Sequence, residues 1–330
     1  MRFYLAPLEG ITGYIYRNAL EKYFPGADRY MTPFIVPDRN RALRTKELRD
    51  ILPENNRVRD LVPQILTNDA DRFHEAVQAL GEYGYEEVNL NLGCPSGTVV
   101  SRRRGAGLLG FPEELDHFLD RIFSENQVRI SVKTRLGMEK PEEAFRLMEI
   151  YNQYPLSELI IHPRTRQEYY RGAPHFEIFG ELQKLAKMPV CYNGNLLTVR
   201  DYTSFCAHFP ETEAVMLGRG VIANPALFRE LSNDASGGQL PGKLTKEELR
   251  AFHDEVFFGY REVFGNDSNA VFRMKEMWTY LLHSFADPER QAKKIRKART
   301  KEEYLLAVEG IFAACELQPD GPEFWNLPQK

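Results

Sequence analysis

The chain has 330 residues, of which 43% are hydrophobic and 27% charged, as in an ordinary globular protein. A barrel domain uses about 250 residues, so this length predicts one barrel followed by a smaller second domain. The formal net charge of −4 excludes an argument for nucleic-acid binding from total charge, so any such binding would need a local cluster of cations.

The cysteines and the N-terminal residues bear on the compartment of the protein. Cys94, Cys191, Cys206 and Cys315 form no C-x-x-C pair, and their spacing suits neither a zinc site nor a disulfide framework. We therefore expect a reduced, cytoplasmic protein that holds no metal. The first residues contain no apolar signal core, and no apolar run approaches the roughly 20 residues that span a bilayer. We expect neither export nor membrane insertion.

Short β-rich runs alternate with amphipathic helical patterns over most of the chain. Several runs are continuously apolar, as in parallel strands that are covered on both faces. Eight alternating units favour an α/β fold of the (β/α)8 barrel type, although a doubly wound open sheet would show the same alternation. The predicted strands are 3–7, 29–35, 61–67, 87–93, 128–135, 158–163, 189–195 and 214–220.

The pattern changes near residue 235, after which only helices are predicted. The segment 233–243 is rich in Gly, Ser, Asn and Pro, which is typical of a linker. Thr245 with Glu248, and Thr300 with Glu303, form capping boxes that open a first and a last helix. The first helix should end near residue 264, and further helices are predicted at 271–285 and, with a basic sequence, at 288–298. The predicted division is a barrel domain 1–235, a linker 236–244, a helical bundle 245–317 and an irregular tail 318–330.

Polar residues follow the ends of most predicted strands, which is where barrels of this type carry functional groups. The loops after the seventh and eighth strands combine Gly194, Gly218 and Gly220 with Arg219. Glycines let a backbone approach an anion, and arginine adds a bidentate cation, so this pair of loops predicts a phosphate site. The same residues would also serve in ordinary tight turns.

Six short motifs occur in order at these strand ends: LAPLEGITG, NLNLGCPS, VKTR, IHPRT, YNGN and MLGRG. Together they resemble the dihydrouridine synthase family, over residues 3–228. The resemblance implies a barrel that binds FMN, is reduced by NADPH and acts on uridines in tRNA. The helices after the linker also fit this family, as a tRNA-binding domain.

The resemblance also implies a set of cofactor-binding residues. Leu8 replaces a methionine that is usual in the family, and Asn195 stands where an aspartate is frequent. A lysine near the pyrimidine end of a reduced flavin would stabilise its negative charge, which is the role implied for Lys133. The residues implied to contact the flavin are Ala6, Pro7, Leu8, Gln64, Lys133 and His162, and those implied to hold its phosphate are Asn193, Gly194, Asn195, Gly218 and Arg219.

By the same resemblance Cys94 is the catalytic general acid. A lone cysteine is usually a small buried hydrophobe, but Cys94 lies between Gly93 and Pro95 just past a strand end. An ordinary thiol is mostly protonated at neutral pH, as an acid must be. The implied mechanism is hydride transfer from the reduced flavin to C6 of uracil with proton donation by Cys94 to C5, and Asn91 would position the base or the cofactor.

The segment GAGLLG, residues 105–110, matches the dinucleotide pattern G-x-G-x-x-G. Three arginines precede it where that motif needs a strand, so we interpret it as a loop that packs onto the barrel after Cys94.

A basic cluster supports a nucleic-acid partner. Seven cations fall within residues 287–301, which predicts contact with a phosphate backbone, although such clusters are commonly just solvated helix faces. Tyr169 and Tyr170 could stack on an unpaired base. The residues predicted to contact the substrate or tRNA are Asn91, Arg135, Arg164, Arg166, Arg273, Lys275, Lys293, Lys294, Arg296 and Lys297.

Two alternatives stay open at this point. One is a flavin barrel acting on a free pyrimidine, similar to dihydroorotate dehydrogenase, and the other is a tRNA-binding protein without catalytic activity. The sequence does not indicate which uridine is reduced, whether NADPH or NADH is preferred, or the oligomeric state, and nothing in it requires a protein partner.

Overall fold

The computed structural model describes residues 1–38, 40–125, 128–235 and 242–318. Its centre is a single parallel sheet with the order β3-β2-β1-β9-β8-β7-β6-β5-β4. The strands are β1 (Arg2–Leu5), β2 (Arg29–Met31), β3 (Leu61–Val62), β4 (Gln64–Ile65), β5 (Glu87–Leu92), β6 (Arg129–Arg135), β7 (Leu159–His162), β8 (Val190–Tyr192) and β9 (Ala214–Leu217).

The sheet closes on itself through one interrupted strand. The predicted strand 61–67 is observed as β3 and β4, separated by Pro63, which has no N–H for the ladder. β3 pairs with β2 and β4 pairs with β5, so the two ends of the sheet order are neighbours in the chain. The predicted (β/α)8 barrel is confirmed. The one difference is that its third strand is divided into β3 and β4.

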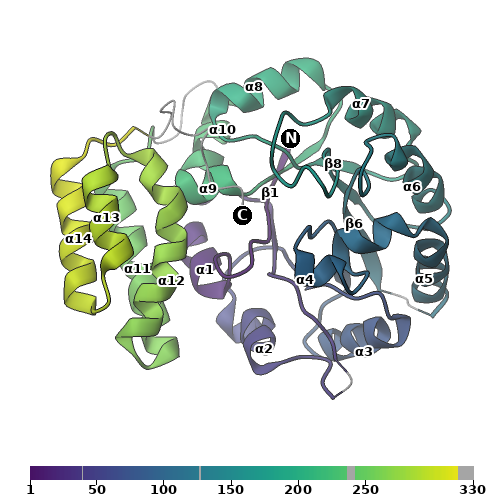
Figure 1. Cartoon of the computed structure of the whole chain (residues 1–330), viewed down its shortest axis with the longest axis horizontal. Coiled ribbons are helices and arrows are strands. Elements are labelled where there is room, and N and C mark those ends of the chain that lie inside the picture. Colours follow the sequence, from purple (N-terminus) through teal and green to yellow (C-terminus); the bar gives the residue numbers. More distant parts are fainter. Residues whose placement is uncertain (39, 126–127, 236–241, 319–330) are drawn as a thin grey trace.

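Helices surround the strands on the outside (Figure 1). They are α1 (Tyr14–Tyr23), α2 (Thr45–Ile51), α3 (Ala70–Gly81), α5 (Pro112–Glu125), α6 (Glu143–Tyr151), α7 (Phe176–Leu185), α8 (Val199–His208) and α10 (Leu227–Ala235). Two short helices, α4 (Gly97–Val100) and α9 (Arg219–Ala223), follow β5 and β9. The main apolar core lies between strands and helices, and a smaller one that includes Tyr4, Met31 and Met216 fills the barrel.

The segment Gly105–Gly110 is a 3₁₀ helix whose first five residues are buried. An added Cβ on Gly107 would lie 2.8 Å from the backbone of Val100, so this glycine allows the segment to pack against α4. The interpretation of GAGLLG as a packed loop, and not a dinucleotide-binding turn, is confirmed.

The C-terminal helices are α11 (Lys246–Phe264), α12 (Asp267–Leu281), α13 (Glu289–Lys297) and α14 (Lys301–Ala314). Both predicted capping boxes are present, at Thr245 and at Thr300. α12 begins four residues earlier than predicted, because the side chain of Asn266 accepts a hydrogen bond from the N–H of Asn269 and caps its start. Most of the predicted linker and tail, residues 236–241 and 319–330, lies outside the described residues.

The helical bundle packs against one side of the barrel, next to α1 and α9 (Figure 1). The Tyr260 hydroxyl of α11 donates to the Ile11 carbonyl at 3.3 Å, and Arg229 of α10 pairs with Glu248 at 2.7 Å. Among the helices that the structure describes, none combines the length and apolarity needed to cross a membrane.

Candidate active site at the mouth of the barrel

A cavity of about 590 Å³ opens at the carboxyl ends of the strands. Loops from every β/α unit meet at this end of a barrel, so this is where barrel enzymes carry their active sites. The bundle contributes part of the wall through Glu276, Thr279 and Tyr280 of α12. The predicted site residues that line the cavity are Ala6, Pro7, Leu8, Asn91, Cys94, Lys133, Arg135, His162, Asn193, Gly194, Gly218 and Arg219.

The other predicted residues lie behind or beside this wall. Gln64 and Arg164 are fully buried, and Arg166 is half-buried in the loop after β7. Arg273 lies between barrel and bundle, where it donates to the Gly10 carbonyl at 2.8 Å. Lys275 donates to the Ala298 carbonyl within the bundle.

A buried chain of amide side chains leads to Cys94. The Gln64 amide nitrogen donates to Asn89 Oδ1 at 2.7 Å, and Gln64 Oε1 accepts from Asn91 Nδ2 at 2.7 Å. Asn91 Oδ1 then accepts the backbone N–H groups of Gly93, at 3.1 Å, and Cys94, at 2.9 Å. A fully satisfied buried network is rigid, so Gln64 and Asn91 hold the loop that carries the thiol.

The environment of Cys94 keeps its thiol protonated. Burial raises the pKa of Cys94, and this outweighs the opposite influence of the nearby cations Arg135 and Lys133. The Cys94 carbonyl accepts the N–H of Ala106 at 3.1 Å, which fixes the backbone under the 3₁₀ helix. A proton is therefore available at Sγ at neutral pH, as a general acid requires.

Lys133 is the cavity residue with the least compensated charge. Burial and the neighbouring Arg135 lower its pKa to about 7. Its ammonium has no hydrogen bond or ion pair with any residue that the structure describes. A half-buried cation without a partner is unfavourable, so Lys133 marks a place where an anionic ligand would be stabilised.

Two buried arginines hold the loop between β7 and α7. Arg135 donates to the carbonyls of Gly93, at 2.8 Å, and Tyr169, at 2.6 Å. Arg164 donates to the carbonyls of residues 171 and 172, at 3.1 and 2.6 Å. Burial lowers the pKa of both, that of Arg164 to about 10. Because their donors are largely occupied by backbone acceptors, they act on a ligand mainly through their charge.

His162 is a neutral imidazole in this setting. Burial and four surrounding cations lower its pKa well below the ordinary value. Its Nε2 lies 3.0 Å from the Arg164 guanidinium, which can only donate, so Nε2 is the acceptor and Nδ1 carries the hydrogen. The ring of Tyr170 lies 5.6 Å from the imidazole and also faces Arg135 and Arg219, at 5.2 and 4.9 Å.

The loops after β8 and β9 form the predicted phosphate region. α9 begins at Arg219, and the N–H groups of Val221 and Ile222 both donate to the Gly218 carbonyl, at 3.0 and 3.2 Å, which leaves the first two N–H groups, those of Arg219 and Gly220, without an acceptor within the helix. An added Cβ on Gly218 would lie 3.3 Å from side-chain atoms of Ala6 and Leu8, so a larger residue would crowd the cavity. Arg219 donates to Asn195 Oδ1 at 2.8 Å, which ties the two loops together.

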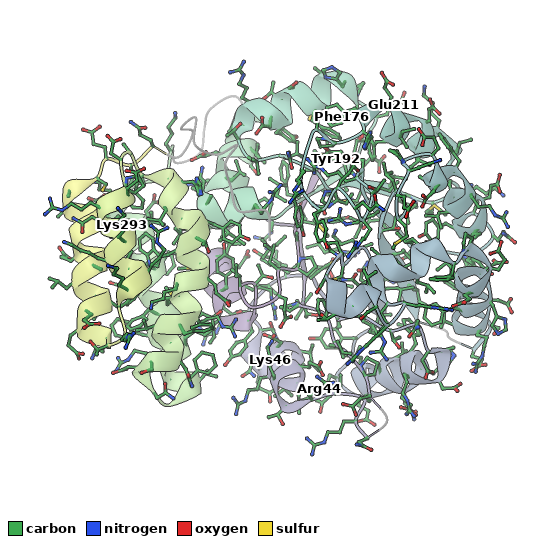
Figure 2. The ribbon with its side chains drawn as sticks, viewed as in Figure 1. Arg44, Lys46, Phe176, Tyr192, Glu211 and Lys293 are labelled. Carbon is green, nitrogen blue, oxygen red and sulfur yellow. The ribbon has the colours of Figure 1, made fainter. Side chains whose placement is uncertain are left out.

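The cations of α13 differ from those of the cavity. Lys293, Lys294, Arg296 and Lys297 are exposed, and none makes a hydrogen bond or ion pair through its side chain with a described residue. Lys293 lies over the bundle, to one side of the barrel (Figure 2). These four side chains are therefore accessible to an anionic partner in solution.

Several residues that line the cavity were not among the predicted site residues. Glu9 follows the first strand end directly and lies within LAPLEGITG, so its position was the available clue. Thr279 and Tyr280 come from a helix whose contact with the barrel depends on tertiary packing. Among the described residues, no group of three or more His, Cys, Asp or Glu side chains is arranged to hold a metal ion.

Comparisons with known proteins identify the family of this chain. The family model described as Dihydrouridine synthase (Dus) matches residues 4–307. The tRNA-dihydrouridine(16) synthase of Pseudomonas putida is 32% identical over 246 residues, which cover 72% of this chain and 75% of that protein. The tRNA-dihydrouridine(16) synthase of Aquipseudomonas alcaligenes is 30% identical over 259 residues, which cover 76% of this chain and 81% of that protein.

Among solved structures, morphinone reductase matches with a TM-score of 0.50 and 14% sequence identity. The match covers 72% of this chain and 86% of the morphinone reductase chain, and it shows only that the two proteins share a fold. The fold and the family thus define a β/α-barrel enzyme, with a candidate active-site cavity at the mouth of the barrel. The chain belongs to the dihydrouridine synthase family, which confirms the resemblance seen in its motifs.

Proposed function

We propose that this chain reduces specific uridines of tRNA to 5,6-dihydrouridine, with FMN as the bound cofactor and NADPH as the reductant. Membership of the family and the names of the relatives support the reaction and the tRNA substrate. The observation that carries the proposal is the half-buried, unpartnered Lys133 in the same cavity as a protonated Cys94.

The cavity suits an anionic, phosphorylated cofactor. Lys133, Arg135, Arg164 and Arg219 surround it with positive charge, which also depresses the pKa of His162. Such a field stabilises a ligand with negative charge on both its ring and its phosphate. The first turn of α9 and Arg219 would hold the phosphate, and Ala6, Pro7 and Leu8 would contact the ring.

Three residues of the cavity then have a chemical role. A bound reduced flavin supplies the hydride for C6 of uracil. Cys94 Sγ donates the proton to C5, and Asn91 keeps the loop of Cys94 in position. Lys133 offsets negative charge next to the ring. The positioned acid is expected to contribute about 10²- to 10⁴-fold to the rate.

The helical bundle is proposed as the tRNA-binding part of a cytoplasmic enzyme, with residues 1–235 as the catalytic domain. The free cations of α13 would contact phosphates, and such contacts position a nucleic acid without reading its sequence. The target uridine must leave its stack to enter the cavity, which is easiest in a loop.

A map of dihydrouridine in the tRNA of cells with and without this gene tests the proposal. We expect at least one tRNA position to lose dihydrouridine in the deletion strain and to regain it when the intact gene is restored. An unchanged map in cells without a redundant enzyme would reject tRNA as the substrate. Turnover of free uracil or orotate instead would favour a small-molecule reductase.

A further inference from the structure

A second cavity, of about 410 Å³, lies between the barrel and the helical bundle. Its apolar wall includes Tyr14 and Ile15 of α1 together with Val263 and Phe264 at the end of α11. The rings of Phe264 and Tyr260 are stacked, with centroids 5.6 Å apart. The size falls within the range of small-ligand sites, and flat aromatic walls suit a planar, uncharged ring.

This cavity and the active-site cavity share a common wall. Glu9 lines the active-site cavity and pairs with Lys46, which lines the second. Glu276 lines the active-site cavity and pairs at 2.8 Å with Arg273, which lines the second. The segment of Glu9 and Gly10 therefore separates the second cavity from the active-site cavity.

The charge at the rim of the second cavity comes mainly from Arg49. Lys46 and Arg273 are paired with carboxylates, whereas the exposed Arg49 has no hydrogen bond or ion pair through its side chain among the described residues. The carboxylate of Asp50, also in the wall, accepts the N–H of Tyr14 at 2.8 Å. Figure 2 shows Lys46 on the part of the barrel near the bundle.

We propose that the second cavity is a subsite for a nucleotide next to the uridine that is reduced. Moving a uridine out of its stack leaves a neighbouring base unstacked, and stacking on aromatic side chains is worth about 1–3 kcal/mol per base. Tyr14 and Phe264 contact that base, and Arg49 contacts its phosphate. The inference rests on the proposed function and adds a feature that helps to select the uridine.

Steady-state kinetics with a tRNA transcript and NADPH test the subsite in the full-length, flavin-loaded protein. Arg49→Glu reverses the free charge, and Val263→Trp fills the cavity without a change of charge. Each should raise the KM for tRNA about tenfold, as expected for one lost base or phosphate contact, with little change in the rate of flavin reduction by NADPH. Arg200→Glu is the matched control, since Arg200 is an exposed arginine on α8, on the other side of the barrel from α2 (Figure 1).

The outcomes separate the possible explanations. An unchanged KM for tRNA in both variants, while the wild type reduces tRNA, overturns the subsite and leaves the proposed function intact. An effect of Arg49→Glu alone means that the rim binds phosphate and no base enters, which also overturns it. A raised KM for NADPH with an unchanged KM for tRNA would assign the cavity to the reductant. Failure of the wild type to act on any tRNA rejects both proposals. The melting temperature of each variant identifies loss of folding.

Discussion

The molecule carries two groups of cations whose physical situations are opposite. Arg135 in the cavity wall and Arg164 behind it are buried and donate to backbone carbonyls, and Lys133 is half-buried in the wall with no partner among the described residues. On α13, Lys293 and Lys297 are exposed and unpaired. Exposed cations cost little to maintain, whereas buried ones oppose folding unless a ligand or acceptor compensates them. The cavity therefore specifies a particular anion, and α13 provides general attraction for a polyanion.

Substitution of Cys94 should have the largest effect and shows whether the cavity does chemistry or only binds. Cys94→Ala is expected to lower the turnover of tRNA by about 10²- to 10⁴-fold, because the proton donor to C5 is lost. The flavin content of the purified variant and its rate of reduction by NADPH should stay near those of the wild type. Cys206→Ala, at a half-buried cysteine outside the cavity, is the control and should be fully active. Normal turnover by Cys94→Ala would reject the acid role.

Neutralising the exposed cations of α13 should have the next largest effect, and it tests whether they attract the polyanion. A variant with Lys293, Lys294, Arg296 and Lys297 all changed to Gln is expected to bind tRNA about 10- to 100-fold more weakly. The salt dependence of binding should also become shallower, since fewer counterions are released. Binding measured over a series of salt concentrations gives both quantities. A salt dependence like that of the wild type would show that α13 does not contact the phosphates.

A further effect concerns stability, and it comes from Lys133. Lys133→Met removes an unpaired, half-buried cation, so the cofactor-free variant should unfold with a free energy higher by roughly 1–4 kcal/mol at neutral pH. It should also retain flavin poorly, because the charge opposite the ring is lost. Chemical denaturation of the cofactor-free protein measures the first effect, and lower stability of the variant would contradict it.

The pH dependence of stability has a definite sign at this residue. The pKa of Lys133 is about 7 in the folded protein and 10.5 for an ordinary lysine. Between these values the unfolded chain binds more protons, so the contribution of Lys133 to stability rises as the pH increases through this window. The corresponding slope should be reduced in Lys133→Met.

Much of the site could be predicted because strand ends in a parallel barrel meet at one place. Cys94, Lys133 and Arg219 were found in this way, from motifs at separate strand ends. A position at a strand end does not reveal whether the side chain faces the cavity or lies behind its wall. Gln64 is predicted to contact the cofactor, and in the structure it is buried in the chain of amides that holds the loop of Cys94, so its contact with the cofactor stays a prediction.

Features that depend on packing between distant segments were not accessible from the sequence. The contribution of Tyr280 to the cavity and the second cavity beside Arg49 both require the docking of the bundle on the barrel. The division of one strand at Pro63 had a clear signal, the missing N–H of proline, as did the start of α12 at Asn266, which directly follows Gly265.

The most direct test of the account is the cofactor content of the purified full-length protein. Release by denaturation, followed by absorption spectroscopy and mass spectrometry, should give close to one FMN per chain, and Lys133→Met should contain clearly less. A colourless protein that takes up no added FMN would contradict the assignment of the cationic cavity as a flavin site.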